Sequence, residues 1–149
     1  MSQRRPVDPH ELRVALAAVT PWLAGEAPQP TPAELARAVR LSLRTLAQLA
    51  PGATVEVRVP PLAVVQCVAG PRHTRGTPPN VVETDPRTWL ELVTDRVPWI
   101  VALAQGRVMA SGIRADVSGW LPLIRHPAVD HPPPRESGED NPIAGVPAT

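Results

Sequence analysis

Few side chains in this sequence are suited to chemistry, and the single cysteine is the first of them. Cys67 follows Val64 and Val65 and precedes Val68, so its surroundings are apolar. A reactive thiolate needs a neighbouring cation or a helix N-terminus that lowers the thiol pKa, and no nearby residue offers this. We expect Cys67 to be a small buried hydrophobic residue, and a nucleophilic cysteine is the weaker interpretation.

The polar stretch GPRHTRGTPPN, residues 70–80, is the other candidate for chemistry. Arg72 and Arg75 flank His73, and two guanidinium groups beside an imidazole can bind a phosphate or a carboxylate. Such a loop could hold the head group of a ligand. A solvated connection between two strands, rich in Gly and Pro, is the simpler explanation.

An enzymatic activity is the least favoured interpretation. His73 with Glu83 or Asp85 could act as an acid–base pair, but the sequence does not establish their geometry. No Ser or Cys nucleophile stands in a recognisable catalytic context, and the four His show no metal-ligand spacing. We therefore expect no catalytic residue, no metal and no cofactor.

Length and composition restrict the class of protein. A chain of 149 residues is long enough for one domain with a real core. A formal net charge of +1 gives no field that would favour nucleic acid as a partner. A single cysteine is compatible with a reducing compartment, and no run of about 18 apolar residues is present. We expect a cytoplasmic protein.

Two helices are predicted in the first third of the chain. Residues 8–23 begin with Asp8 and Pro9, and residues 31–50 begin with Thr31-Pro32 and end before Pro51-Gly52. The second helix carries three Arg at spacings of three and four along one face: Arg37, Arg40 and Arg44. This stripe is expected to be a solvated helix face, and weak contact with a membrane surface is the alternative.

Strands are predicted next, and the Trp-rich segment from 82 to 123 follows them. Residues 54–59 alternate strictly, residues 62–69 are more continuously apolar, and the short connection predicts an antiparallel pair. A short strand over 80–84 precedes two short helices, the first beginning at Asp85-Pro86 and the second ending at Gly106. A strand over 107–113 and a last helical turn after Asp116 complete the pattern.

The order of these elements resembles the sterol carrier protein family. The segment TDPRTWLELVTDRVPWIVALAQGRVMASG resembles that family's helix starting at an Asp, short second helix ending in Gly-Arg, and following strand. The segment VEVRVPPLAVVQCVAGPRHTRGTPPNVVETDPRTWL resembles an actinobacterial branch of small sterol-carrier-like proteins. The resemblance covers about residues 31–123, and residues 1–30 resemble the N-terminal extension of that branch.

The resemblance implies an α+β fold, an antiparallel sheet of about five strands with helices packed on one face and an apolar tunnel between the layers. We expect an N-terminal helical extension and linker over 1–30, the sterol carrier protein-like domain over 31–124 and a disordered Pro-rich tail over 125–149. Family ligands are acyl chains, sterols and similar molecules. The chain lacks Phe altogether, so the Phe-rich cavity wall of animal sterol carriers is missing and sterol is a doubtful ligand.

The favoured function is a non-catalytic carrier that binds and transports an apolar or amphipathic small molecule, such as an acyl lipid. Arg72, His73 and Arg75 would hold its head group. The predicted apolar wall consists of Trp89, Leu92, Val93, Trp99, Leu103, Val108, Ala110 and Leu121. The alternative is an interaction or regulatory protein with a filled core and no ligand, which recognises a protein partner or forms a homodimer.

Overall fold

The computed structural model describes residues 5–71 and 80–125. Arg72, His73 and Arg75 and almost all of the predicted tail therefore lie outside the described residues. The elements follow one another as α1 (Pro9–Leu23), α2 (Pro32–Leu49), β1 (Val55–Val59), β2 (Ala63–Cys67), β3 (Val81–Thr84), α3 (Pro86–Val93), α4 (Trp99–Ala104), β4 (Val108–Ser111) and the 3-10 helix η1 (Ser118–Trp120).

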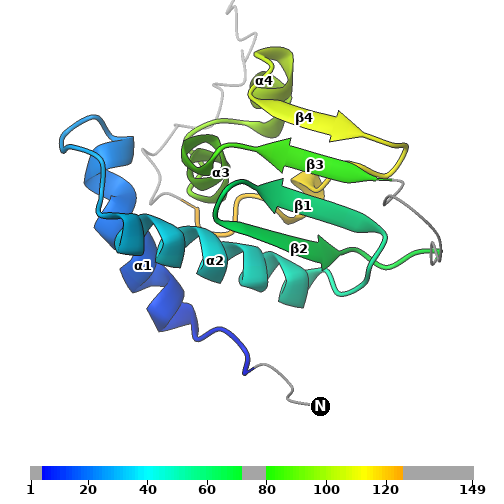
Figure 1. The fold of residues 1–149 in the computed structure, drawn as a ribbon, viewed down its shortest axis with the longest axis horizontal. Coiled ribbons are helices and arrows are strands. Elements are labelled where there is room, and N and C mark those ends of the chain that lie inside the picture. The colour runs from blue at the N-terminus through cyan, green and yellow to red at the C-terminus, as the bar shows by residue number, and fades with distance from the viewer. Residues whose placement is uncertain (1–4, 72–79, 126–149) are drawn as a thin grey trace, which may run out of the picture.

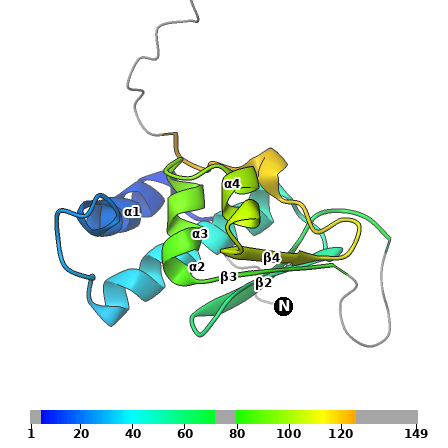
Figure 2. The same ribbon diagram turned by 90° about the horizontal axis from the view of Figure 1, so that it is seen from above.

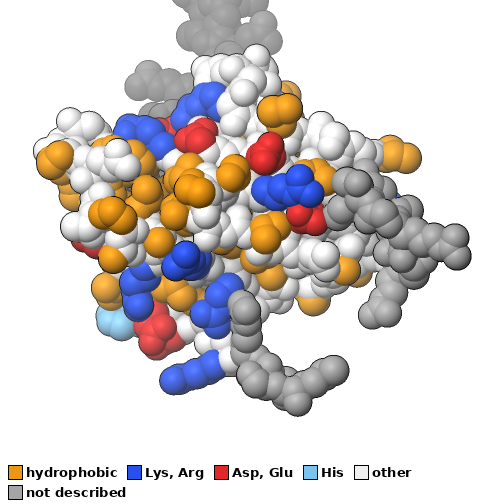
Figure 3. Space-filling view, viewed as in Figure 1, with side chains coloured by type: hydrophobic (Ala, Val, Ile, Leu, Met, Phe, Trp, Pro, Cys, Tyr) orange, Lys and Arg blue, Asp and Glu red, His pale blue; other side chains and the backbone are white. Residues whose placement is uncertain are grey.

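The elements form two layers, with the helices on one face of the sheet (Figures 1 and 2). In Figure 2 the strands lie along the lower side of the molecule, and α1, α3 and α4 lie above them, while α2 begins to the left at the level of the strands and rises to the right. The opposite face of the sheet carries hydrophobic side chains and charged side chains of both signs (Figure 3). Arg58 and Glu56 form an ion pair on this face, with the guanidinium Nε 2.6 Å from the carboxylate.

The described part of the chain contains no helix that is long and apolar enough to cross a membrane.

Side chains at the predicted starts cap three of the helices, with Asp8 before α1, Thr31 before α2 and Asp85 before α3. The Asp8 carboxylate accepts a hydrogen bond from the His10 N–H, and α1 follows directly. Thr31 and Glu34 form the reciprocal pair of bonds known as a capping box at the start of α2. The predicted helix starts are thus confirmed, because each cap satisfies amide groups that have no partner within the helix.

The sheet is mixed, and the prediction of about five antiparallel strands was wrong on both points. Within the described residues the strand order is β2-β1-β3-β4. The pairs β1–β2 and β3–β4 are antiparallel, as expected, but β1 and β3 run parallel. Cys67 at the end of β2 pairs with Val55 at the start of β1. The chain thus leaves β2 at the end of the sheet where β1 begins. Because β3 starts at that same end, beside Glu56 of β1, it runs in the same direction as β1.

Tight packing of two backbone segments ends β2 at this point. The Val68 N–H donates to the Ala50 carbonyl at 2.7 Å, and the Val68 carbonyl accepts from Thr54 N–H at 3.1 Å. Gly52 lies so close that a Cβ there would be 2.1 Å from the Val68 carbonyl oxygen, and its φ is +145°. Only glycine fits this turn, which holds the end of α2 against the end of β2.

The core lies between the two layers and includes α1. Leu12, Leu16 and Val19 of α1 are buried in the same cluster as Val39 of α2 and Val57 of β1. The N-terminal helix is thus packed on the rest of the fold, with five buried residues in 15. Its buried apolar side chains recur at helical spacing, as expected of a helix with one buried face.

Asn80 ties three segments together at the start of β3. Its side-chain amide donates to the Thr54 carbonyl at 3.0 Å, and its side-chain oxygen accepts from the Arg114 N–H at 2.9 Å. Its own carbonyl accepts from the Glu56 N–H at 3.0 Å. Asn80 is only 5% exposed, so these bonds are shielded from water.

We predict that Asn80→Ala lowers the free energy of unfolding by about 1–3 kcal/mol, because it leaves a buried carbonyl and a backbone N–H without their partner. Urea unfolding measures the change. Gln66→Ala is the matched control, since Gln66 is an exposed amide on the open face of β2. Equal losses in the two variants would contradict the assigned role of Asn80.

Burial raises the pKa of the Cys67 thiol to about 11. Cys67 is fully buried in the core, so the charged thiolate is disfavoured there. We predict that the thiol of the native protein resists disulfide reagents at pH 8 and reacts readily in denaturing urea. Rapid labelling of the native protein would contradict this.

The same pKa shift predicts a pH dependence of stability. The folded-state pKa lies above the ordinary thiol value of about 8.5, so the stabilising effect of the neutral thiol is complete below that pH. It is lost as the pH rises from there towards 11. Cys67→Ala should remove this component from the difference between unfolding free energies measured at pH 8 and pH 10.

Candidate functional site

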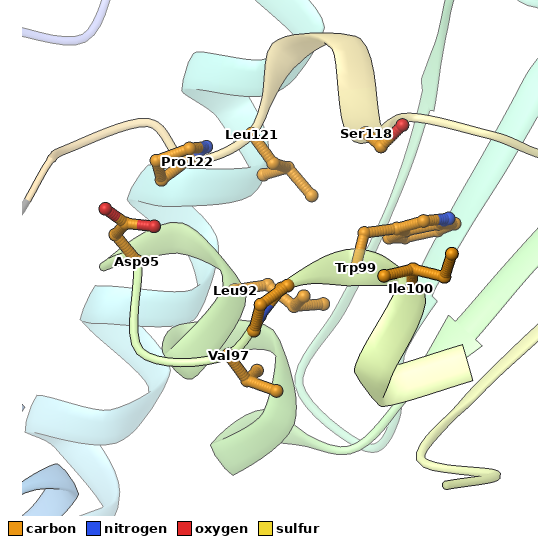
Figure 4. A pocket seen from close by; sticks show the side chains of 9 residues that line it. Leu92, Asp95, Val97, Trp99, Ile100, Ser118, Leu121 and Pro122 are labelled. Atoms are coloured by element: carbon orange, nitrogen blue, oxygen red, sulfur yellow. The ribbon is translucent and has the colours of Figure 1, made fainter. Parts of the chain in front are cut away.

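An apolar hollow of about 370 Å³ opens on the helical side of the molecule, between the end of α3, the start of α4 and the segment around η1 (Figure 4). Leu92, Trp99 and Leu121 line it from these three segments, and Ile100 lies beside the Trp99 ring. Asp95 and Ser118 supply polar groups at its margin. We refer to it as the Trp99 hollow. Its size falls near the lower end of small-molecule sites, which span about 300–1,000 Å³.

The walls of the Trp99 hollow are held by backbone hydrogen bonds at the end of α3. The Val93 carbonyl accepts bonds from the N–H groups of Leu123 and Ile124 at 3.0 and 3.1 Å. These bonds fix the segment that carries Leu121 against α3. The chain then turns at Asp95, which has a φ of +63°, and leads into α4.

Helix α4 is apolar around almost its whole circumference, yet only Ala102 of its six residues is buried. Ile100 is 74% exposed, Val101 37% and Leu103 36%. A helix that is apolar on all sides is expected to be covered. Met109 of β4 is also largely exposed, but it pairs with Glu83 on the open face of the sheet and does not line the hollow. The part of the rim that α4 forms is therefore apolar and open to solvent.

The structure separates the eight residues of the predicted apolar wall into three groups. Three of them line the Trp99 hollow together: Leu92, Trp99 and Leu121. Three others are buried in the core between the layers: Trp89, Val93 and Val108. The last two, Leu103 and Ala110, are exposed to solvent and line neither the hollow nor the core.

Trp89 is buried for a structural reason that the sequence analysis missed. Its indole N–H donates to the Ser42 hydroxyl at 2.8 Å, and that hydroxyl donates in turn towards the Ala38 carbonyl at 2.7 Å. Both side chains are fully buried. The available signal was a serine on the apolar face of α2, since a buried hydroxyl needs a polar partner.

The carboxylates proposed as partners of His73 are placed differently from each other. The Asp85 carboxylate accepts bonds from the Thr88 N–H and hydroxyl and caps α3. Partial burial opposes its ionisation, but the bonds from Thr88 and the charge of Arg107 outweigh this and lower its pKa. Asp85 is therefore held as a structural anion. Glu83 lies on the open face of the sheet.

The arginine stripe of α2 is partly engaged within the protein. Arg40 Nε donates to the Leu62 carbonyl at 3.2 Å, and an Arg44 nitrogen donates to the Arg5 carbonyl at 2.8 Å. Basic side chains gather over α2 in Figure 3. Only Arg37 of the three lacks such a bond among the described residues, so most of the stripe serves packing between segments.

Comparison with known proteins gives the family. No curated protein matches the chain. The family model described as a bacterial SCP ortholog matches residues 31–123, which is more than half of the chain and spans α2 through η1. The chain thus belongs to the sterol carrier protein-like family, whose general role is that of a lipid-binding carrier.

Proposed function

We propose that this protein is a non-catalytic carrier that binds an apolar or amphipathic small molecule in the Trp99 hollow. The observation that supports the proposal best is the combination of an apolar hollow with an exposed apolar helix at its rim. Family membership supports a lipid-like ligand. The aromatic ring of Trp99 and the aliphatic side chains of Leu92 and Leu121 suit an alkyl chain better than a polar metabolite.

The binding mechanism is the burial of apolar surface. Removing apolar area from water contributes roughly 25 cal/mol per Å², so an alkyl chain needs few polar contacts to bind. The ligand occupies the Trp99 hollow, which lies outside the space between the sheet and the helices. In that space, Trp89, Leu43 and Leu46 are fully buried and packed with other side chains.

The test is a titration of the full chain with decan-1-ol, a neutral alkyl compound, followed by Trp emission. We predict a saturable change, because Trp99 lines the hollow and would exchange water for alkyl contacts. Ile100→Ser should weaken binding about fivefold or more, since losing about 1 kcal/mol of apolar contact corresponds to that factor. Ile100 is 74% exposed, so the melting temperature should change little.

Ile113→Ser is the matched control for this titration. Ile113 is fully exposed and does not line the Trp99 hollow, so this variant makes the same chemical change elsewhere. Its affinity for decan-1-ol should equal that of the parent. The carrier proposal fails if the parent shows no saturable response, or if the two variants bind equally well.

A second candidate function, an interaction protein without a ligand, is favoured by the exposed apolar side chains of α4 and β4. Ile100, Leu103 and Met109 could be covered by a protein partner or by a second copy of the chain. Sedimentation velocity over a range of concentrations distinguishes the functions. A dimer that Met109→Ser disrupts, together with no response to decan-1-ol, would favour the interaction protein.

A further inference from the structure

A second groove lies on the other side of the segments that form the Trp99 hollow. It runs between α1 and the last described residues, and two adjoining hollows of about 310 and 290 Å³ make it up. Arg13 and Ile124 line both hollows, so the two lie next to each other. In Figure 2 the chain after η1 passes over the side of the helices that faces away from the sheet. We refer to this feature as the arginine groove.

One end of the arginine groove is lined by three arginines, Arg13, Arg96 and Arg125. Among the described residues, the ion pairs engage Arg58, Arg87 and Arg107, and none engages these three. Their side chains also make no hydrogen bond within that part of the chain. The structure thus places three positive charges together around one hollow.

Arg96 carries the sharpest indication of a missing partner. Its Nε atom is buried and has no hydrogen-bond partner in the described part of the protein. A buried donor without a partner is unfavourable, and donors on a guanidinium group are matched best by the two oxygens of a carboxylate or by a phosphate. An anion that entered this end of the groove would meet the Arg96 guanidinium, whose other N–H groups can donate to it.

The other end of the arginine groove is apolar. Leu12 of α1, Leu49 of α2 and Leu123 line it, and Leu49 is 57% exposed. Leu16 and Ile124 continue this apolar lining to the arginines. A ligand that fits both ends needs a negative head group and an apolar chain.

We propose that the arginine groove binds a single-chain amphipathic carboxylate, such as a fatty-acid anion. Its carboxylate lies at Arg13, Arg96 and Arg125, and its alkyl chain extends past Ile124 towards Leu49. Helix α1 forms one wall of the groove and lies outside residues 31–123, so this site depends on a part of the chain that the family match does not include. The site is separate from the Trp99 hollow, and neither proposal depends on the other.

The test is calorimetric titration of the full chain with decanoate, the carboxylate of the same chain length as decan-1-ol. Arg13→Gln and Arg125→Gln should each weaken decanoate binding about fivefold or more. Both residues are exposed and make no hydrogen bond among the described residues, so folding should be retained. Arg37→Gln is the matched control, because Arg37 is an exposed arginine of α2 that does not line the groove, and the affinity of this variant should stay within twofold of the parent.

The apolar end is tested by Leu49→Ser, with Val14→Ser as its control. Both side chains are about half exposed on helices, at 57% and 52%, but only Leu49 lines the groove. Leu49→Ser should weaken decanoate binding and leave the binding of the shorter hexanoate unchanged. Val14→Ser should change neither.

The outcomes separate this proposal from the carrier proposal. If Ile100→Ser weakens decanoate binding while Arg13→Gln and Arg125→Gln leave it unchanged, decanoate occupies the Trp99 hollow and the arginine groove is not its site. If the arginine variants lower decanoate affinity while Ile100→Ser does not, the groove is confirmed whatever decan-1-ol does. Absence of decanoate binding to the full chain would overturn the proposal.

Discussion

A hydrogen bond between two buried side chains, from the Trp89 indole to the Ser42 hydroxyl, fixes the position of α3 on α2. A buried indole N–H without a partner would cost about 1–3 kcal/mol, so the pair strongly restricts how α3 can rotate and slide. The features of the helical side depend on that restriction. Leu92 forms the floor of the Trp99 hollow, and the Val93 carbonyl holds the last described segment.

A second set of interactions connects α3 with α1 and β4 through the Glu91 carboxylate. Arg87 and Arg107 both pair with Glu91, and Arg107 also donates to the Thr88 hydroxyl. The Arg87 guanidinium lies 4.7 Å from the centre of the Trp22 ring of α1. These are partly exposed charges, so each pair contributes little to stability, but together they orient α1 and β4 around α3. The arginines of this cluster are structural, in contrast to those of the arginine groove.

Local signals in the sequence predicted the helices and strands well. The pairing of the strands depends on long-range geometry, which these signals do not contain. The caps at Thr31 and Asp85 and the glycine at Gly106 mark helix ends that the structure confirms, because caps act within one turn of the chain. The parallel pairing of β1 and β3 has no local signature. It follows from where the chain re-enters the sheet, and Asn80 determines that position through bonds to distant residues.

The candidate site could be predicted only in part, for a similar reason. Leu92, Trp99 and Leu121 were expected to share an apolar wall, and they line one hollow. Periodicity placed Trp89 on that same wall, but it cannot distinguish a side chain that fills the core from one that lines a cavity. Ala110 lies on the same side of its strand as Val108, yet it is exposed, because burial depends on whether a helix extends over that position. The arginine groove joins α1 to residues 94–96 and 123–125, and no sequence pattern links segments so far apart.

The bonds from Leu123 and Ile124 to the Val93 carbonyl have a consequence for communication across the molecule. Asp95 and Val97 line the Trp99 hollow, while Thr94 and Arg96 line the arginine groove, so alternate residues of one short segment belong to opposite sides. Two occupants would share this strip of backbone as a common wall. If the binding of one occupant changed the affinity for the other through that wall, the binding of the second would change the affinity for the first by the same factor, since heterotropic linkage is reciprocal.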